Sequence, residues 1–345
     1  MPEHSQESAS QLQTEQPIAR EVASNIWKIT IPIPFPLRTV NMYILQGKEG
    51  WALIDTGMGT PDARAAFEEG MRIAGVNLAG LRAIVLTHHH PDHIGLSGEL
   101  HEKSGVPVYI HPIDRASLRM MYSGTMPERF GKVSDFFAQH GFPRTHLWLS
   151  RMDSQAMRQI ISVPPDEAFH MVEDAQRLEL LDEVYEIIWT PGHADGQICL
   201  FRERDGVFFS ADHVLPRITP NIGLYSALDR PNPLQDYLDS LDKVSTVPAR
   251  IVLPGHREPF SNLLQRTTEI IEHHQQRLAQ IVTLLEKQPQ HATQVMEQLF
   301  SDRLKNDEAR RMAVAEVLSH LEYLRYKGQV TQQKTNDGLI LYEVR

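Results

Sequence analysis

The chain has 345 residues, of which 41% are hydrophobic and 23% charged, values typical of a globular protein with one large domain and a smaller one. Its formal net charge of −10 disfavours nonspecific attraction to nucleic acid or to an anionic membrane, although it leaves room for a local positive site. No apolar run approaches the roughly 20 residues that span a bilayer, and the single cysteine, Cys199, excludes an intramolecular disulfide.

The first part of the chain predicts a polar tail followed by strands. Residues 1–16 lack the basic-then-apolar layout of an export signal, so we expect a disordered tail and a cytoplasmic protein. From residue 25 to about 57 the pattern is rich in strands. The predicted strands cover residues 25–31, 40–45 and 51–54, and Gly47 and Gly50 separate the last two.

Helices then alternate with strands. Thr60 has the side chain of a helix N-cap, and Pro61 suits the first helical position. The pattern continues as a strand at 82–87, a helix at about 92–104 and a strand at 106–110. This order predicts an α/β or α+β fold in which helices pack on sheets.

Residues 112–175 differ in composition and predict a helical insertion of about three helices. Large apolar side chains are frequent in it, and they either form a core of the insertion itself or line an apolar substrate pocket. These side chains are Met120, Met121, Met126, Phe130, Phe136, Phe137, Phe142, Trp148, Met152 and Met157.

Strand patterns resume after the insertion, at about 176–181, 184–189, 197–202 and 207–210, and again at 251–253. Cys199 lies within an apolar strand, so we expect a buried thiol and not a ligand or nucleophile.

The C-terminal residues 263–345 predict a separate small domain. Helical patterns at 263–285, 293–299 and 310–326 precede a hairpin signal at Asp337-Gly338, which is the plan of a winged helix. Residues 271–345 carry ten basic and ten acidic side chains. A nucleic-acid module usually has a basic excess, so a role in packing or in a homodimer contact is favoured.

The segment Thr87-His88-His89-His90-Pro91-Asp92-His93 is the most informative motif. It places three imidazoles and a carboxylate at 88, 90, 92 and 93, directly after an apolar strand. Neutral imidazole and carboxylate are ligands of zinc and similar metals, and strand ends are common places for chemistry. The motif therefore predicts a metal site, in which His89 is not a ligand.

Three further ligand-type residues follow strands in the same way. They are His193, Asp212 and His256, and both histidines come after a Pro-Gly turn. Asp55 has the same placement, and we expect it to orient a ligand histidine without binding the metal itself.

The ordered set His88-x-His90-x-Asp92-His93, His193, Asp212 and His256 resembles the metallo-β-lactamase-fold hydrolase superfamily over residues 25–260. The C-terminal segment resembles the winged-helix domain of one branch, which includes bacterial hydrolases and an animal endoribonuclease. The resemblance implies an α+β fold, a four-layer αββα sandwich with the helical insertion. Its domains would be the catalytic domain at 17–262 and the winged-helix-like domain at 263–345.

The same resemblance implies a two-metal centre. His88, His90 and His193 would hold the first ion, Asp92, His93 and His256 the second, and Asp212 would bridge both. Zinc fits these ligands, and iron or manganese fits them too. Asp92 and Asp212 would take part in catalysis, in which a metal-bound hydroxide attacks the substrate.

The leading functional hypothesis is hydrolysis of a small ester, thioester or lactone with an apolar part. One alternative is a phosphodiesterase or single-strand ribonuclease that uses the same metals, and another is a non-enzymatic metal-dependent ligand sensor. Tyr225 and Arg217 are candidate donors to a substrate oxygen, with Tyr225 the proposed catalytic one. We expect His111 and His213 to be structural or to support a ligand residue, and the pair His273-His274 to face solvent or an interface.

Overall fold

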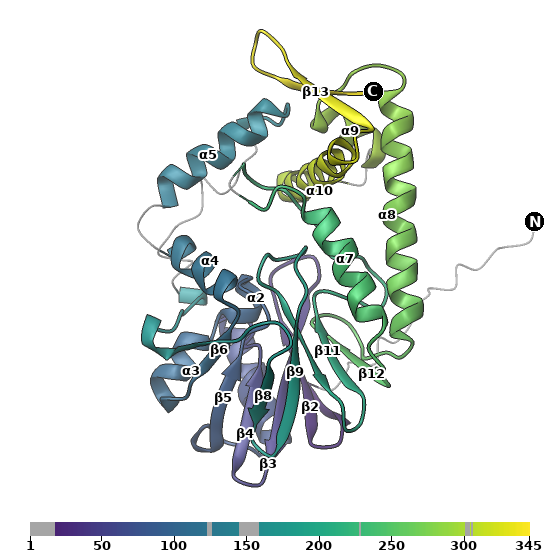
Figure 1. The fold of residues 1–345 in the computed structure, drawn as a ribbon. Helices are drawn as coiled ribbons and strands as arrows, with labels where there is room; N and C mark the ends of the chain where they lie inside the picture. The colour runs from purple at the N-terminus through teal and green to yellow at the C-terminus, as the bar shows by residue number, and fades with distance from the viewer. Residues whose placement is uncertain (1–17, 123–125, 145–158, 228, 301–303, 305) are drawn as a thin grey trace, which may run out of the picture.

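The structure is a computed structural model in which two β-sheets lie between layers of helices (Figure 1). The expected disordered tail at 1–16 lies outside the described residues. The described residues are 18–122, 126–144, 159–227, 229–300, 304 and 306–345.

The N-terminal half forms a seven-stranded sheet whose strands follow one another in chain order. The first strands pair antiparallel as hairpins, and the pairs from β4 onward are parallel. The strands are β1 (Ala19–Ala23), β2 (Ile26–Pro32), β3 (Thr39–Gly47), β4 (Gly50–Ile54), β5 (Leu81–Val85), β6 (Val108–Ile110) and β7 (Phe169–Met171).

A second sheet of five strands has the order β12-β11-β10-β9-β8. Only β11 and β12 pair in parallel, because helix α7 (Pro233–Ser245) lies between them in the chain. The strands are β8 (Arg177–Leu180), β9 (Glu183–Trp189), β10 (Ile198–Arg202), β11 (Val207–Ala211) and β12 (Ile251–Pro254).

Alternation along each strand builds the layers. In β4, Trp51 and Leu53 join the core beneath the N-terminal helices, while Ala52 and Ile54 join the core between the sheets. In the same way β10 directs Leu200 to the core between the sheets and Phe201 to the core under the helices of the second sheet. Successive strand side chains point to opposite faces, so each sheet is buried on both sides. This confirms the expected mixed α+β sandwich.

Helices cover the outer faces of both sheets. Helix α1 (Pro61–Ile73) begins at Thr60, whose Oγ1 accepts from the peptide N of Ala63, as the sequence predicted. Gly70 lets this helix approach β2, since a Cβ there would collide with Ile29. The helix predicted at 92–104 is wrong as one element, because it is divided at Gly95 and Leu96 into α2 (Pro91–Ile94) and α3 (Ser97–Ser104).

The insertion contains α4 (Pro112–Tyr122) and α5 (Met126–Gln139), and it also supplies the edge strand β7. The expectation that the insertion forms a core of its own is wrong for Phe137 and Phe142. Both rings are buried in one cluster with residues of the C-terminal helices, such as Leu285, Val295 and Leu321. Trp148, Met152 and Met157 lie outside the described residues.

The C-terminal residues have the three helices and the hairpin that the sequence predicted. Figure 1 shows α8 running from the second sheet up to the hairpin, with α9 and α10 beside it. Helix α7, which begins at the cap Asn232 and Pro233, was not predicted. The C-terminal elements are α8 (Leu263–Leu285), α9 (Ala292–Phe300), α10 (Asp307–Tyr326), β13 (Val330–Lys334) and β14 (Ile340–Val344).

Candidate metal centre

The candidate ligands come from the ends of strands in both sheets. His88 and His90 follow β5, His193 follows β9, Asp212 follows β11 and His256 follows β12. The structure brings these segments together at one edge of the sandwich. Ligand-type atoms lie within 4.8 Å of one another in three groups, which are His88-His90-His193, His88-His93-Asp212 and Asp92-His93-His256.

Asp212 lies at the centre of these groups. Its Oδ2 atom is 3.2 Å from Nε2 of His256, 3.6 Å from Nε2 of His93 and 3.6 Å from Nε2 of His193. Asp92 lies to one side, with Oδ2 3.5 Å from Nε2 of His256 and 3.9 Å from Nε2 of His93. One carboxylate therefore faces imidazoles from helix α2 and from two separate loops.

The other ring nitrogen of each of these imidazoles is hydrogen-bonded away from the centre. Nδ1 of His193 lies 2.9 Å from the carbonyl oxygen of Asn221, and Nδ1 of His256 lies 2.6 Å from that of Thr39. A carbonyl oxygen only accepts, so Nδ1 carries the proton and, in the neutral ring, Nε2 keeps its lone pair toward Asp212. This is the arrangement that outer partners impose on metal-binding histidines.

His88 and His90 complete the group. Nε2 of His88 lies 3.0 Å from Nδ1 of His90, and Nδ1 of His88 lies 3.0 Å from the hydroxyl oxygen of Thr87. That hydroxyl donates to Oδ2 of Asp55 at 2.8 Å, so it accepts from His88. Two nitrogens bound to one tetrahedral zinc ion are roughly 3.3 Å apart, which is close to the spacing of His88 and His90.

The electrostatics divide the imidazoles into two kinds. Burial, aided by neighbouring imidazoles, holds the pKa of His88 and of His90 well below the ordinary value. Burial also lowers the pKa of His193, against the opposing charge of Asp212. These three rings are therefore neutral near pH 7, the form that binds a cation.

The remaining imidazoles lie close to the carboxylates. Burial acts to lower the pKa of His93 and of His256, but the carboxylates, Asp212 foremost, outweigh it and raise both. Burial also acts to raise the pKa of Asp212, but His256 and His93 hold it well below its ordinary range. The centre therefore favours positive charge at the point where Asp212 meets these two rings.

These residues fit a metal. Nε2 of His93, His193 and His256 and Oδ1 of Asp212 are buried, and none has a hydrogen-bond partner among the described residues. Buried polar atoms without partners are rare in proteins, and several that converge on one point indicate a ligand set.

Asp55 lies beside one of the candidate ligand histidines. Its Oδ2 atom lies 2.7 Å from Nδ1 of His93, and its Oδ1 accepts from the peptide N of Thr87 at 2.8 Å. One carboxylate thus fixes a candidate ligand ring and the strand end that carries the His-rich motif.

Other supporting residues were missed in the sequence. Asp114 is fully buried and accepts from the peptide N of His89 and of Gly196, both at 2.8 Å, so it joins the His-rich loop to the His193 loop. At Gly255 an added Cβ would collide with Oδ1 of Asp212, so the turn before His256 needs glycine. Only the Pro-Gly turn was visible as a signal in the sequence.

The residues expected to be structural lie outside the ligand groups. His111 stacks on Trp189, with ring centroids 5.4 Å apart. His213 is buried edge-on against Tyr237, and burial lowers its pKa to about 3. Cys199 is buried, which confirms the expected buried thiol, and burial raises its pKa to about 12. His89 belongs to none of the three ligand groups.

Of the pair His273-His274, the second residue lies inside the protein. His274 is buried, with Nδ1 3.1 Å from Nε2 of His320 on α10, so the interfacial placement is confirmed and exposure to solvent is wrong for it. Tyr225 is hydrogen-bonded through its hydroxyl to Asn221 and packs under Arg311, while Arg217 is exposed. A catalytic role for Tyr225 stays a prediction.

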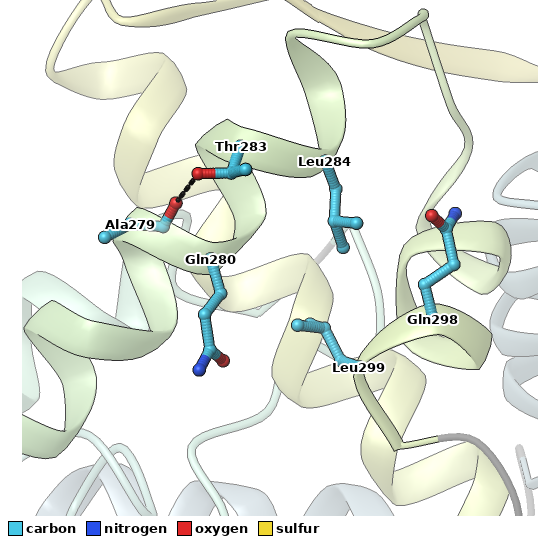
Figure 2. A pocket seen from close by; sticks show the side chains of 6 residues that line it. All are labelled: Ala279, Gln280, Thr283, Leu284, Gln298 and Leu299. Atoms are coloured by element: carbon cyan, nitrogen blue, oxygen red, sulfur yellow. Dashed lines mark hydrogen bonds between the residues drawn. The ribbon is translucent and has the colours of Figure 1, made fainter.

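A hollow of about 480 Å³ lies between α8 and α9, and Figure 2 shows the side chains that line it. None of the candidate ligands lines it. In its lining, the hydroxyl of Thr283 donates to the carbonyl oxygen of Ala279 at 3.0 Å. The lining residues are Ala279, Gln280, Thr283, Leu284, Gln298 and Leu299.

Comparisons with known proteins agree with this fold. Residues 36–256 match the family model "Metallo-beta-lactamase superfamily", and residues 278–345 match "Metallo-beta-lactamase-like, C-terminal domain". The first match covers more than half of the chain, so the chain belongs to the metallo-beta-lactamase superfamily. It is a metal-dependent hydrolase.

Individual relatives extend over both parts of the chain. The probable metallo-hydrolase YqjP of Bacillus subtilis is 27% identical over 309 residues, which are 88% of this chain and 93% of that protein. A metallo-beta-lactamase family protein of Thermus thermophilus has 35% identity and a TM-score of 0.81, covering 94% of this chain and 100% of its own. The atrochrysone carboxyl ACP thioesterase of Aspergillus fumigatus is 23% identical over 256 residues, 74% of this chain and 62% of that enzyme.

Among the helices that the structure describes, none combines the length and the apolar character needed to cross a bilayer.

Proposed function

We propose that the protein hydrolyses a small ester, thioester or lactone with an apolar acyl part, at a centre that holds two divalent metal ions. The observation that carries the proposal is the convergence of buried, unpartnered nitrogens from three separate segments on the carboxylate of Asp212. Such an arrangement is costly for the protein unless cations occupy it.

In this proposal His88, His90 and His193 would hold one ion, Asp92, His93 and His256 would hold the other, and the carboxylate of Asp212 would be shared between them. The proposal is supported by the grouping of the ligand atoms into these two sets of three within 4.8 Å. Bound divalent cations lower the pKa of water and polarise a carbonyl oxygen.

The chain's own side chains orient and tune this centre. Asp55 fixes the ring of His93, and the carbonyl oxygens of Asn221 and Thr39 fix the rings of His193 and His256. Asp92 and Asp212 cancel only part of the positive charge of two divalent ions, because the five imidazoles are neutral as ligands. The remaining charge favours binding of a carbonyl oxygen as negative charge develops on it.

The class of substrate is supported by one relative and by the apolar side chains of the insertion. One relative is named a thioesterase that acts on an acyl carrier protein. The insertion supplies apolar side chains such as Met120, which is 41% exposed on α4. Ligand pockets are lined mainly by apolar side chains, so exposed apolar side chains in the insertion suit an apolar acyl group.

We propose zinc as the metal, because imidazole and carboxylate ligands suit it, and iron or manganese would fit the same residues. Residues 263–345 would form a winged-helix domain with a structural role. Its order of three helices and a hairpin supports this assignment, as does the balance of ten basic and ten acidic residues at 271–345.

The experiment is a hydrolysis assay on acyl-thioesters, aryl esters and lactones, with the purified full chain before and after chelation. We expect turnover of at least one class, loss of that turnover after chelation, and recovery with Zn²⁺. Asp212→Ala should lower kcat/KM at least about a hundredfold, since loss of outer partners alone costs 10–100-fold. Chelator-insensitive turnover, or full activity in Asp212→Ala, would overturn the proposal.

Two other outcomes would redirect the assignment. Cleavage of single-stranded RNA that is lost in His90→Ala would favour a phosphodiesterase or ribonuclease, since the same ligands suit phosphoryl transfer. Metal-loaded protein that turns over no substrate but binds one ligand tightly would favour a sensor.

A further inference from the structure

The loop 212–226 connects the candidate metal centre to the C-terminal domain. It leaves β11 at Asp212, passes His193 and reaches the surface of α10. At Asn221 its main chain faces the centre, because the carbonyl oxygen accepts from Nδ1 of His193 at 2.9 Å. The orientation of the His193 ring therefore depends on where the main chain of Asn221 lies.

The side chain of Asn221 is hydrogen-bonded in the opposite direction, to the C-terminal domain. Its Nδ2 lies 3.2 Å from the carbonyl oxygen of Met312 and 3.3 Å from Oε2 of Glu316, both on α10. Its Oδ1 accepts from the hydroxyl of Tyr225. One residue thus joins a candidate ligand to helix α10 through its own backbone and side chain.

Neighbouring contacts hold the same stretch of loop on the same face of α10. The hydroxyl of Ser319 donates to the carbonyl oxygen of Ile222 at 2.6 Å, and the peptide N of Leu224 donates to the carbonyl oxygen of Ala315 at 3.0 Å. Leu224 and Ala315 are both buried in the cluster of the C-terminal domain. The loop is consequently fixed by α10 along the stretch from 221 to 224.

We propose that Asn221 is a positioning residue through which the C-terminal helix α10 sets the ring orientation of His193, so that the C-terminal domain is part of the metal site. This inference rests on the proposed metal centre, because it assigns a function to the support of one of its ligands. Outer partners that fix a ligand imidazole change metal affinity when they are removed.

The test uses the full chain and Zn²⁺ alone as the probe, measured by competition with a chromophoric chelator. Asn221→Ala keeps the carbonyl that His193 uses and removes the side-chain bonds to α10 and Tyr225. We expect the affinity for one of two bound Zn²⁺ ions to fall about tenfold, at the lower end of the range for outer partners. The affinity for the other ion should stay unchanged.

A second readout separates positioning from general loss of structure. In protein loaded with Co²⁺, the ligand-field absorption bands report the geometry around the ion, and they should shift in Asn221→Ala. The matched control is Asn306→Ala, which removes the side-chain cap of α10 at Ala309 without touching the loop. Its Zn²⁺ affinities and Co²⁺ bands should equal those of the wild type.

If Asn221→Ala fails to fold, the same test is made on its partner with the variants Glu316→Ala and Glu316→Gln. The alanine variant should reproduce the loss of affinity, and the glutamine variant should restore it, because its amide oxygen still accepts from Asn221. Wild-type affinities and unshifted bands in Asn221→Ala, or in Glu316→Ala, would overturn the inference and leave the metal centre standing. A wild-type chain that binds no Zn²⁺ would overturn the proposed function and this inference with it.

Discussion

Oδ2 of Asp55 lies 2.7 Å from Nδ1 of His93, and both side chains are buried. The backbone of Asp55 has a φ of 58°, a left-handed conformation that asparagine also tolerates. Asp55→Asn is therefore a substitution that keeps the shape and removes the charge. The amide keeps only one acceptor oxygen, so its NH₂ group replaces either Oδ1, which accepts from the peptide N of Thr87, or Oδ2, which accepts from the Thr87 hydroxyl and faces Nδ1 of His93.

We expect Asp55→Asn to lower the affinity for one Zn²⁺ ion by about 10–100-fold, because a carboxylate partner fixes the tautomer of a ligand histidine and raises its basicity. Competition with a chelator measures the affinity. Asp239→Asn, at an exposed position on α7, is the control and should leave it unchanged. Equal affinities in wild type and Asp55→Asn would show that Asp55 only holds the strand end.

The insertion helix α5 packs against the C-terminal core through Phe137. Phe137→Ala removes a fully buried ring from the cluster that includes Leu285 and Leu321. Deleting a buried phenylalanine costs about 3–5 kcal/mol, so the free energy of unfolding should fall by that order. Urea unfolding of the wild type, Phe137→Ala and the exposed control Lys132→Ala measures it. A change below about 1 kcal/mol in Phe137→Ala would contradict the packing of α5 on this core.

The buried pair His274 and His320 should make stability depend on pH. Burial lowers the pKa of His274 to about 2 and that of His320 to about 4, so both are neutral in the folded chain above those values. The unfolded state, with a histidine pKa near 6.5, binds more protons between about pH 4 and 6.5. The free energy of unfolding therefore falls as the pH drops below about 6.5. Above that pH, both histidines are neutral in both states and add no pH dependence to it.

Each such histidine contributes a slope of up to about 1.4 kcal/mol per pH unit. We expect His274→Gln to reduce the slope by about that amount, as measured by urea unfolding at several values between about pH 4.5 and 7. His170→Gln, at an exposed position, serves as the control. An unchanged slope in His274→Gln would mean that His274 takes up a proton as easily in the folded chain.

The sequence was most informative where a pattern has a local cause. The strands predicted at 51–54 and 197–202, the Thr60 cap and the helix predicted at 263–285 each follow from neighbours in the chain, and each appears in the structure. The strand-end positions of His88, His193 and His256 could be predicted for the same reason. Strand ends meet at one edge of a sandwich once the sheets pair.

Features that depend on distant partners could not be predicted. The short strand β7 exists because it pairs with β6 across the whole insertion, and Phe137 is buried by helices more than a hundred residues later in the chain. Asp114 and Asn221 resemble ordinary polar residues in the sequence. Their importance follows only from the peptide groups and the imidazole that the fold places beside them.

Seven side chains from both sheets are proposed to hold two metal ions, and the metal content of the purified chain tests that number. The full chain, stripped with chelator, reloaded with Zn²⁺ and freed of excess metal, should contain close to two Zn²⁺ per chain by elemental analysis, and His256→Ala close to one. A wild-type chain that retains no zinc, or a His256→Ala chain that retains as much as the wild type, would contradict the proposed two-metal centre.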